Sequence, residues 1–434
     1  MKFNKWTLGL AAVGAVSMAS AVRADEAKLS QLNTLVSGTT ISGVADVAVQ
    51  YNTGDAHYNQ ITPSGTGSGK VDNFTVNDVL ISLDKALDES PWAAGYHIDL
   101  NWGNDAIQPI NSVATLQYYG GSYYYGAEYT INSGLPVRQA YVTLRTPVGN
   151  GIDWKVGLFD NIIGYESNTS ALNPNYTHSY GYQLEPTSQA GFIGSYKIGN
   201  SITVQAGLAN SYSAYYTYYG GNVSAKTYLA AVTLTAPESW GWAKGAALTV
   251  GANQAFNGNS GSLKNNYNYY YGSNYASYPE STGNYYAGLT LPTPIKALKV
   301  GFAFDLVGYA NEAVSGSLKP NSKDDSVWVA GAYATFQATD KLSVSLRGEY
   351  LNGSALGYSV GSSPLALNKA EEVTATVQYN LWANVVSRVE VRWDHLEQGK
   401  AYGYSSGSGY YYSGNSYGAR SDAFQIALNL AYQF

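Results

Sequence analysis

The sequence contains no cysteine, and only two methionines and four histidines among its 434 residues. Without thiols the chain has no disulfide framework, no Cys-ligated zinc site and no thiol nucleophile. Charged residues are scarce as well, at 12% of the chain where about 25% is usual. The formal net charge of −6 argues against a nucleic-acid partner, because phosphate binding requires a basic surface.

Long hydrophobic runs are absent after residue 21, so no later segment approaches the roughly 18 apolar residues that a membrane-spanning helix needs. At the N-terminus, two lysines precede the short apolar run 8–21, and a small-residue cleavage site follows. This order predicts a signal peptide over residues 1–24 that exports the protein, with an uncleaved anchor as the alternative. Residues 25–37 would form a short periplasmic segment. It is either a frayed tail or a short helix, since its leucines have helical spacing.

What the chain has in abundance, from about Gly38 onward, is alternation of apolar and polar residues with period two, the pattern of a half-buried β-strand. At the C-terminal end, six apolar residues in succession share one face and the chain ends on Phe434. Sixteen such segments can be counted: 44–51, 79–83, 92–102, 138–146, 154–158, 192–198, 202–208, 228–234, 248–250, 289–291, 298–304, 327–337, 342–346, 373–379, 389–393 and 424–434.

The connections between these segments alternate in length. Short turns rich in Pro, Gly, Asn or Asp alternate with eight long segments, at about 52–73, 104–134, 160–186, 210–225, 257–283, 308–324, 352–370 and 397–420. This alternation is typical of barrels in the outer membrane. We therefore predict an all-β fold, a closed antiparallel up-and-down transmembrane β-barrel of about sixteen strands over residues 38–434.

The placement of charge supports this prediction. In hydrocarbon every backbone polar group must be paired within the protein, so spanning strands must close into a barrel whose outer face is apolar. Most strand charges have the opposite parity from the apolar stripe: Asp99, Lys155, Lys299, Arg347, Glu349, Arg388, Glu390, Arg392 and Asp394. The segment 138–146 is an exception, because Arg138 and Arg145 have opposite parity. A β-bulge there would reconcile them.

Two stretches resemble a known family. The first is Val-Leu-Ile-Ser-Leu-Asp-Lys-Ala-Leu-Asp from Val79, with Asp-Leu-Asn-Trp-Gly from Asp99. The second is Arg-Gln-Ala-Tyr-Val-Thr-Leu-Arg-Thr-Pro-Val-Gly-Asn-Gly from Arg138, followed by Gly-Leu-Phe-Asp, Ile-Gly-Tyr-Glu and Asn-Pro-Asn-Tyr up to residue 176. These are similar to the beta-barrel porin family described as OmpL-like, and Phe434 resembles an outer-membrane assembly signal. The resemblance implies a porin-like barrel in the outer membrane and supplies no catalytic residues.

A barrel of sixteen strands is wide enough to leave an aqueous channel. The default function is therefore passive diffusion of small polar solutes or ions, with charged side chains at the narrowest point tuning selectivity. The alternatives are a surface binding or adhesion protein that uses the barrel as an anchor, and an exported soluble β protein. Outer-membrane lipid and small polar solutes are the expected partners, and analogy with general porins suggests a homotrimer.

The third long segment, 160–186, is the candidate constriction, because it carries Asp160, Glu166 and Glu185 and no basic residue. Resemblance to general porins implies that it folds inward and places these acids opposite wall arginines, namely Arg347, Arg388, Arg392 and one of Arg138 or Arg145. The alternative is an outside loop with solvated acids. The full set of pore-lining candidates is Asp99, Arg138, Arg145, Lys155, Asp160, Glu166, Glu185, Arg347, Glu349, Arg388, Glu390 and Arg392.

Four of the long segments are rich in tyrosine and together hold 23 of the 41 tyrosines. Such tracts suit a binding surface, a lid over the pore or a low-complexity tract without a fixed partner. Enzymatic function is not expected. The histidines are scattered, and a wall hydrogen bond between His97 and Asp99 is a simpler interpretation than catalysis or metal binding. No cofactor motif is present.

Overall fold

The computed structural model describes residues 38–52, 70, 73–106, 112–119, 122–131, 136–210, 212, 226–255, 281–310, 324–353, 369–397 and 420–434. The predicted signal peptide and the segment 25–37 lie outside these residues. Eighteen strands are present among them: β1 (Thr39–Asn52), β2 (Asn73–Lys85), β3 (Ala94–Trp102), β4 (Ser112–Tyr119), β5 (Ser122–Ile131), β6 (Val137–Thr146), β7 (Ile152–Asp160), β8 (Ser188–Ile198), β9 (Ile202–Ala209), β10 (Thr227–Thr235), β11 (Ala247–Ala255), β12 (Ser281–Pro292), β13 (Leu298–Ala310), β14 (Asp324–Gln337), β15 (Leu342–Gly353), β16 (Lys369–Trp382), β17 (Val385–Leu396) and β18 (Asp422–Gln433).

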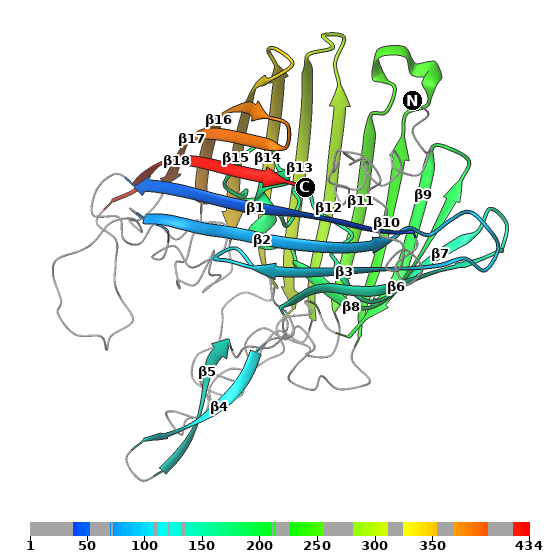
Figure 1. Cartoon of the computed structure of the whole chain (residues 1–434), viewed down its shortest axis with the longest axis horizontal. Helices are drawn as coiled ribbons and strands as arrows, with labels where there is room; N and C mark the ends of the chain where they lie inside the picture. Colours follow the sequence, from blue (N-terminus) through cyan, green and yellow to red (C-terminus); the bar gives the residue numbers. More distant parts are fainter. Residues whose placement is uncertain are drawn as a thin grey trace, which may run out of the picture.

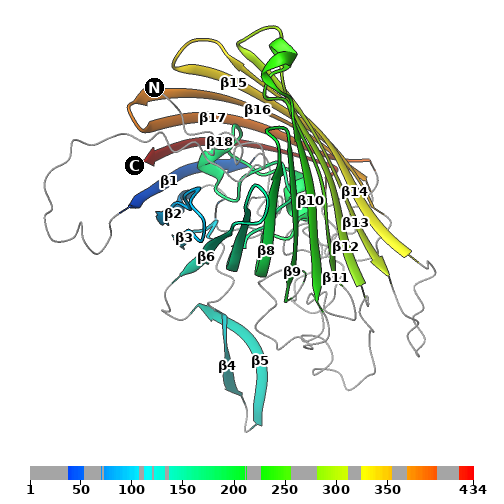
Figure 2. The same ribbon diagram turned by 90° about the vertical axis from the view of Figure 1, so that its right-hand side faces the viewer.

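Sixteen of these strands form one closed antiparallel barrel, shown in Figures 1 and 2. Each strand pairs with the next along the chain, except that β3 pairs with β6 and β1 pairs with β18. Every segment expected from the alternating pattern coincides with one barrel strand, so the predicted fold class is confirmed. Strands β4 and β5 form a separate two-stranded sheet that projects from the barrel (Figure 1), within a segment expected to be a long loop. These strands flank Gly120-Gly121 in the sequence, a common hairpin signal.

The two ends of the barrel differ as expected from the connection lengths. The first residue of β1, Thr39, pairs with Lys85 at the end of β2, next to the short turn 86–93. The chain therefore begins and ends its barrel at the end with short turns, called here the short-turn end. The largest of these turns carries the short helix η4 (Glu238–Ala243). No helix in the described part of the chain is long and apolar enough to cross a membrane.

Closure of the barrel joins the first strand to the last residue. Gly43 N donates to Phe434 O at 2.9 Å, and Phe434 N donates to Gly43 O at 3.0 Å. A Cβ atom on Gly43 would lie 2.3 Å from the backbone oxygen of Leu80 and 2.5 Å from the Phe434 ring, so this close approach requires glycine.

The two faces of the wall separate by chemistry, as β18 illustrates. Phe424, Ile426 and Leu428 are 46%, 41% and 52% exposed, whereas the intervening Gln425 and Asn429 are at most 4% exposed. The outer surface is thus a band of apolar side chains that suits lipid, and the polar side chains face the lumen.

Candidate functional site

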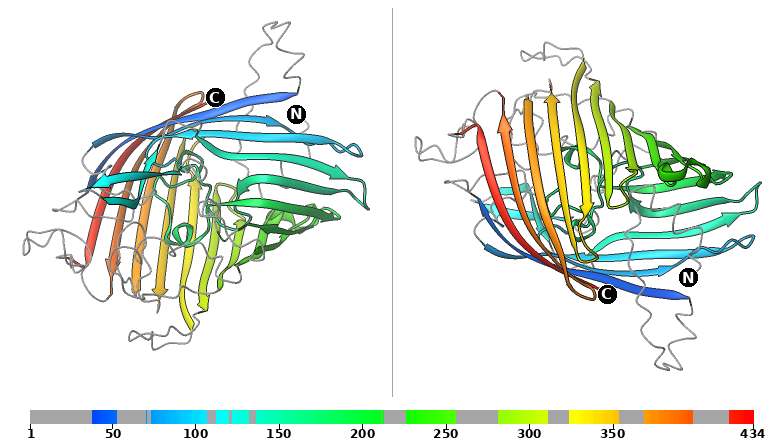
Figure 3. Two further views of the ribbon diagram at one scale, coloured as in Figure 1. Left: turned by 90° about the horizontal axis from the view of Figure 1, so that it is seen from below. Right: turned by 90° about the horizontal axis from the view of Figure 1, so that it is seen from above.

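The segment 161–187, which connects β7 to β8 and is called here the inner loop, lies inside the barrel (Figure 3). It includes the short helices η2 (Ser170–Leu172) and α3 (Tyr180–Leu184). Tyr176 and Tyr180 are fully buried, and Tyr180 packs against inward residues of β13–β18. Burying an irregular loop requires partners for its backbone polar groups. The barrel wall supplies them.

Two wall carboxylates bind backbone N–H groups of the inner loop. Glu390 on β17 accepts from Tyr176 N at 2.5 Å and from Thr177 N at 2.9 Å. Glu349 on β15 accepts from Tyr180 N at 2.5 Å and from Gly181 N at 3.2 Å. Each carboxyl group therefore accepts hydrogen bonds from two neighbouring backbone donors that would otherwise be buried without partners.

Three wall arginines bind the carbonyl groups of the same loop. Arg347 Nη1 donates to Thr177 O at 2.5 Å, and Arg392 Nη1 donates to His178 O at 2.6 Å. Arg388 Nη1 donates to the carbonyls of residues 170, 173 and 175. All three guanidinium groups are at most 1% exposed. They fasten the loop to the wall and do not face an open channel.

Glu166 is the one carboxylate within the inner loop that pairs with a wall arginine. It accepts from Arg347 Nη1 at 2.9 Å and from Ser179 N at 3.1 Å, and it lies 2.8 Å from His178 Nδ1. Burial acts to raise the pKa of Glu166. The charge of Arg347 and the contact with His178 outweigh burial and lower the pKa to about 2. Glu166 is therefore ionised throughout the neutral range.

Glu185 lies in a different environment from the one expected. No cation is paired with it among the described residues, and burial raises the pKa of Glu185 well above its ordinary value. The nearby carboxylates of Asp305, Glu166 and Glu349 raise it further. Its carboxylate occupies the space beside Gly164, where a side chain would clash. Glu185 thus lies near other acids and has no ion pair with a described arginine.

A β-bulge explains the parity conflict in β6. Asp99 pairs with Gln139 while Leu100 pairs with Val137, so Arg138 has no opposing residue in the β3–β6 ladder. The extra residue turns inward, is 4% exposed and forms ion pairs with Asp160 and Asp99. Its Nη1 also donates to Thr169 Oγ1 of the inner loop at 3.1 Å. Arg145, by contrast, binds Asp153 and a carbonyl of the adjacent short turn.

A second bulge has the same consequence in β2. Asp46 pairs with Asp78 while Val47 pairs with Val76, so Asn77 is the extra residue and its side chain turns inward. Asn77 Oδ1 accepts from Tyr176 Oη of the inner loop at 3.2 Å. Both bulges therefore add an inward polar side chain at a point where the loop meets the wall.

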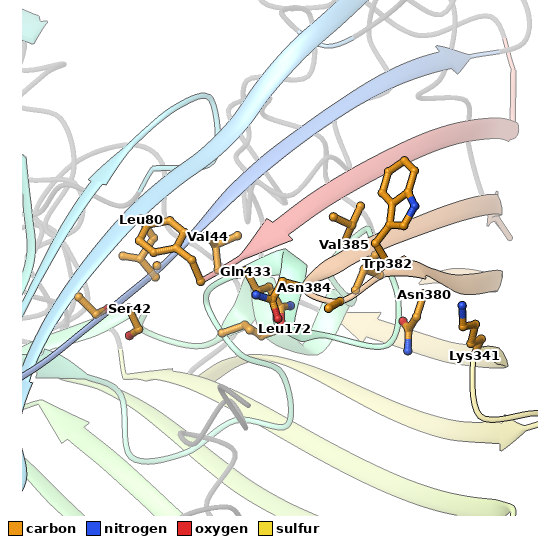
Figure 4. A pocket seen from close by; sticks show the side chains of 15 residues that line it. Ser42, Val44, Leu80, Leu172, Lys341, Asn380, Trp382, Asn384, Val385 and Gln433 are labelled. Carbon is orange, nitrogen blue, oxygen red and sulfur yellow. The ribbon is translucent and has the colours of Figure 1, made fainter. Parts of the chain in front are cut away.

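Two cavities remain beside the inner loop. The larger, called the mouth cavity, has a volume of about 470 Å³ and opens at the short-turn end, where Figure 4 shows Leu80, Leu172, Asn380 and Gln433 around it. The smaller, called the inner cavity, has a volume of about 150 Å³ and lies between the inner loop and the wall of β2, β3, β6 and β7. Both are lined by Leu80, Ser82 and Leu172. The two cavities are therefore adjacent at these three shared residues, which are called here the neck.

The expected site residues fall into two groups. Those lining the inner cavity are Asp99, Arg138, Lys155, Asp160, Glu166 and Glu185. Those lining neither cavity are Arg145, Arg347, Glu349, Arg388, Glu390 and Arg392. Sequence reasoning missed the neck, because Leu80 and Leu172 carry no charge. It also missed Glu372, which pairs with Arg347 at 2.7 Å and whose inward parity was a usable signal. Among the described residues, no group of three potential ligands could hold a metal ion.

Comparisons with known proteins agree with this geometry. The family model "Putative beta-barrel porin-2, OmpL-like" matches residues 38–434. No curated protein sequence matches the chain. Among solved structures, the outer membrane channel DcaP of Acinetobacter baumannii is similar with a TM-score of 0.55 and 13% identity, over 91% of this chain and 97% of that one.

Two further structures are similar at the same level. OmpT of Vibrio cholerae, in a trimer form, matches with a TM-score of 0.53 and 12% identity, over 91% of this chain and 99% of its own. An anion-selective porin from Comamonas acidovorans matches with a TM-score of 0.53 and 10% identity, over 91% of this chain and 99% of its own. At these identities the likeness concerns the fold.

Proposed function

Because the chain belongs to the OmpL-like beta-barrel porin family, we propose that small hydrophilic solutes and ions cross it by passive diffusion along the mouth and inner cavities. The protein is an outer-membrane porin. The single observation that supports this path is that the two cavities share Leu80, Ser82 and Leu172 as lining residues.

The proposed constriction is the inner cavity together with its neck. The ionisable side chains that a permeating ion meets there are Asp99, Arg138, Lys155, Asp160, Glu166 and Glu185. Charges at a narrow point act strongly because little water screens them. The buried arginines Arg347, Arg388 and Arg392 act indirectly in this proposal, by holding the inner loop in place.

Planar-bilayer recording of the refolded protein tests the path. Asp160→Asn removes a negative charge from the inner cavity, so the reversal potential in a salt gradient should shift toward anion preference. Asp340→Asn is the matched control, because Asp340 lies in an exposed short turn and lines neither cavity. Equal reversal potentials for wild type and Asp160→Asn would reject the inner cavity as the path. A protein that never conducts would reject the channel itself.

Two finer features belong to the same proposal. We propose that residues 1–24 are removed on export from a Gram-negative cell, which N-terminal sequencing of protein from outer membranes would test. We also propose a homotrimer, supported by the trimeric form of the similar OmpT structure. Native mass measurement in detergent tests it, and a monomer mass would reject it.

A further inference from the structure

The inner cavity contains an unusual basic side chain. Lys155 on β7 forms no ion pair with any described residue, although Asp99, Arg138, Asp160 and Glu166 in the same cavity are all paired. Its Nζ lies 4.9 Å from the centre of the Tyr141 ring, which in turn stacks on His97 at a centroid distance of 5.1 Å. A cation held over an aromatic face keeps its hydrogen-bonding capacity for another group. Lys155 therefore presents unused donors to the cavity.

Two amide side chains of the same cavity also have unused atoms. The Oε1 atom of Gln205 on β9 is buried and accepts no hydrogen bond in the described part of the chain, and the Nδ2 atom of Asn161 is buried and donates none. Both residues line the inner cavity. Buried polar atoms without partners are costly, and in a native protein they commonly mark a place for water or a ligand.

The charges around these atoms restrict the ligand. A simple anion would meet the nearby carboxylates of Asp160 and Glu166, and a simple cation would meet Lys155 and Arg138. A molecule with a carboxylate and an ammonium on neighbouring atoms has no net charge and can satisfy both kinds of group. Its carboxylate would bind Lys155 Nζ and its ammonium would bind the carboxylate of Asp160, both of which line the inner cavity, while Asn161 Nδ2 and Gln205 Oε1 are unpaired polar atoms of its lining.

We propose that the inner cavity is a binding site for small zwitterions of the amino-acid class, with Lys155 as the residue that selects the carboxylate. This inference rests on the proposed channel, along which the inner cavity would be a weak and saturable binding site. Its volume of about 150 Å³ limits it to small members of the class. Binding must remain weak enough for the solute to leave.

Two measurements on the refolded full-length protein test the site. Glycine should lower the single-channel conductance saturably, beyond the effect of equimolar glycerol, and isothermal titration of the protein in detergent should give a matching dissociation constant. Lys155→Gln should raise that constant about tenfold, the effect expected for one charge-assisted hydrogen bond. Lys155→Arg should restore most of the binding. Lys296→Gln, in an exposed short turn outside both cavities, is the matched control and should bind like wild type.

Several outcomes would overturn the proposal. Equal binding of glycine by wild type and Lys155→Gln would remove Lys155 from the site. Equal effects of glycerol would indicate a polyol site, and equal effects of acetate would indicate an anion site. Heat-dependent mobility in a detergent gel establishes that each variant is folded. Titration reports the site even if no conductance is seen, so failure of the channel and failure of the site remain distinguishable.

Discussion

Arg347→Met should release the inner loop from the wall without opening the barrel. Arg347 donates to Thr177 O, Thr177 Oγ1 and His178 O, and it pairs with Glu166 of the loop and Glu372 of the wall. Removing one partner of a buried ion pair costs about 3–5 kcal/mol, because the remaining charge is uncompensated. Here Glu166 loses its arginine and keeps only the contact with His178, whereas Glu372 keeps its ion pair with Arg392.

At about 1.4 kcal/mol per factor of ten, this cost should increase the population of the released loop by about a hundredfold or more. The barrel itself should persist, because its ladder hydrogen bonds do not involve the Arg347 side chain. We expect larger single-channel conductance and new chymotrypsin cleavage after Tyr176 and Tyr180, which are fully buried in the wild type. Mass spectrometry of the fragments separates these sites from other tyrosines.

Arg145→Met is the matched control, since Arg145 also faces inward but binds Asp153 and a turn carbonyl at the short-turn end. It should leave both readouts unchanged. Adding Glu166→Gln to Arg347→Met should recover part of the loss, because one carboxylate no longer lacks a cation. If Arg347→Met showed wild-type conductance and no cleavage after Tyr176, the assignment of Arg347 as an attachment of the inner loop would be wrong.

Three further predictions concern pH, closure and the neck. The pKa of Glu166 is lowered from 4.5 to about 2, so the stabilisation of the inner loop by its ionised form is complete above pH 4.5 and is lost as the pH falls toward 2. Chymotrypsin is inactive near pH 2, so the change is followed by single-channel conductance. In Glu166→Gln the conductance should no longer change as the pH falls from 4.5 toward 2. Gly43→Ala should destabilise the barrel by about 1–3 kcal/mol because the new methyl group meets the backbone oxygen of Leu80 and the Phe434 ring. Thermal unfolding in a detergent gel checks this against Gly308→Ala, where nothing lies within 4 Å, and equal unfolding temperatures would contradict it. Leu172→Ala widens the neck, so conductance should rise while the reversal potential stays constant; a shifted reversal potential or unchanged conductance would argue against a neck there.

The sequence predicted the barrel well because one physical constraint acts on every strand. Each spanning segment must present apolar side chains to lipid, and this requirement makes apolar and polar residues alternate along the strand. The pattern located all sixteen barrel strands and their alternating connections. It also gave the inward parity of Asp99, Arg347 and Arg388. The hairpin of β4 and β5 was not found, since its tyrosine-rich strands lack that alternation.

The constriction was predicted less completely, and particular residues show why. The alternating pattern predicts that Arg392 points inward, but it does not predict the hydrogen-bond partner of Arg392. In the folded chain Arg392 donates to the carbonyl of His178, over two hundred residues away in sequence. Arg138 could not be placed by parity at all, because a bulge displaces it from the regular alternation. Glu185 is the same residue type as Glu166 but lies beside acids, a difference that depends on where α3 packs.

The sequence alone thus determined the architecture, the two faces of the wall and the segment that carries acids without bases, because these follow from local alternation and from the solvent on each side. Only the tertiary structure decided which charged side chains bind the inner loop to the wall and which line the cavities. That division depends on contacts between residues far apart in the chain, and a buried backbone with no water must find its partners wherever the closed barrel brings them.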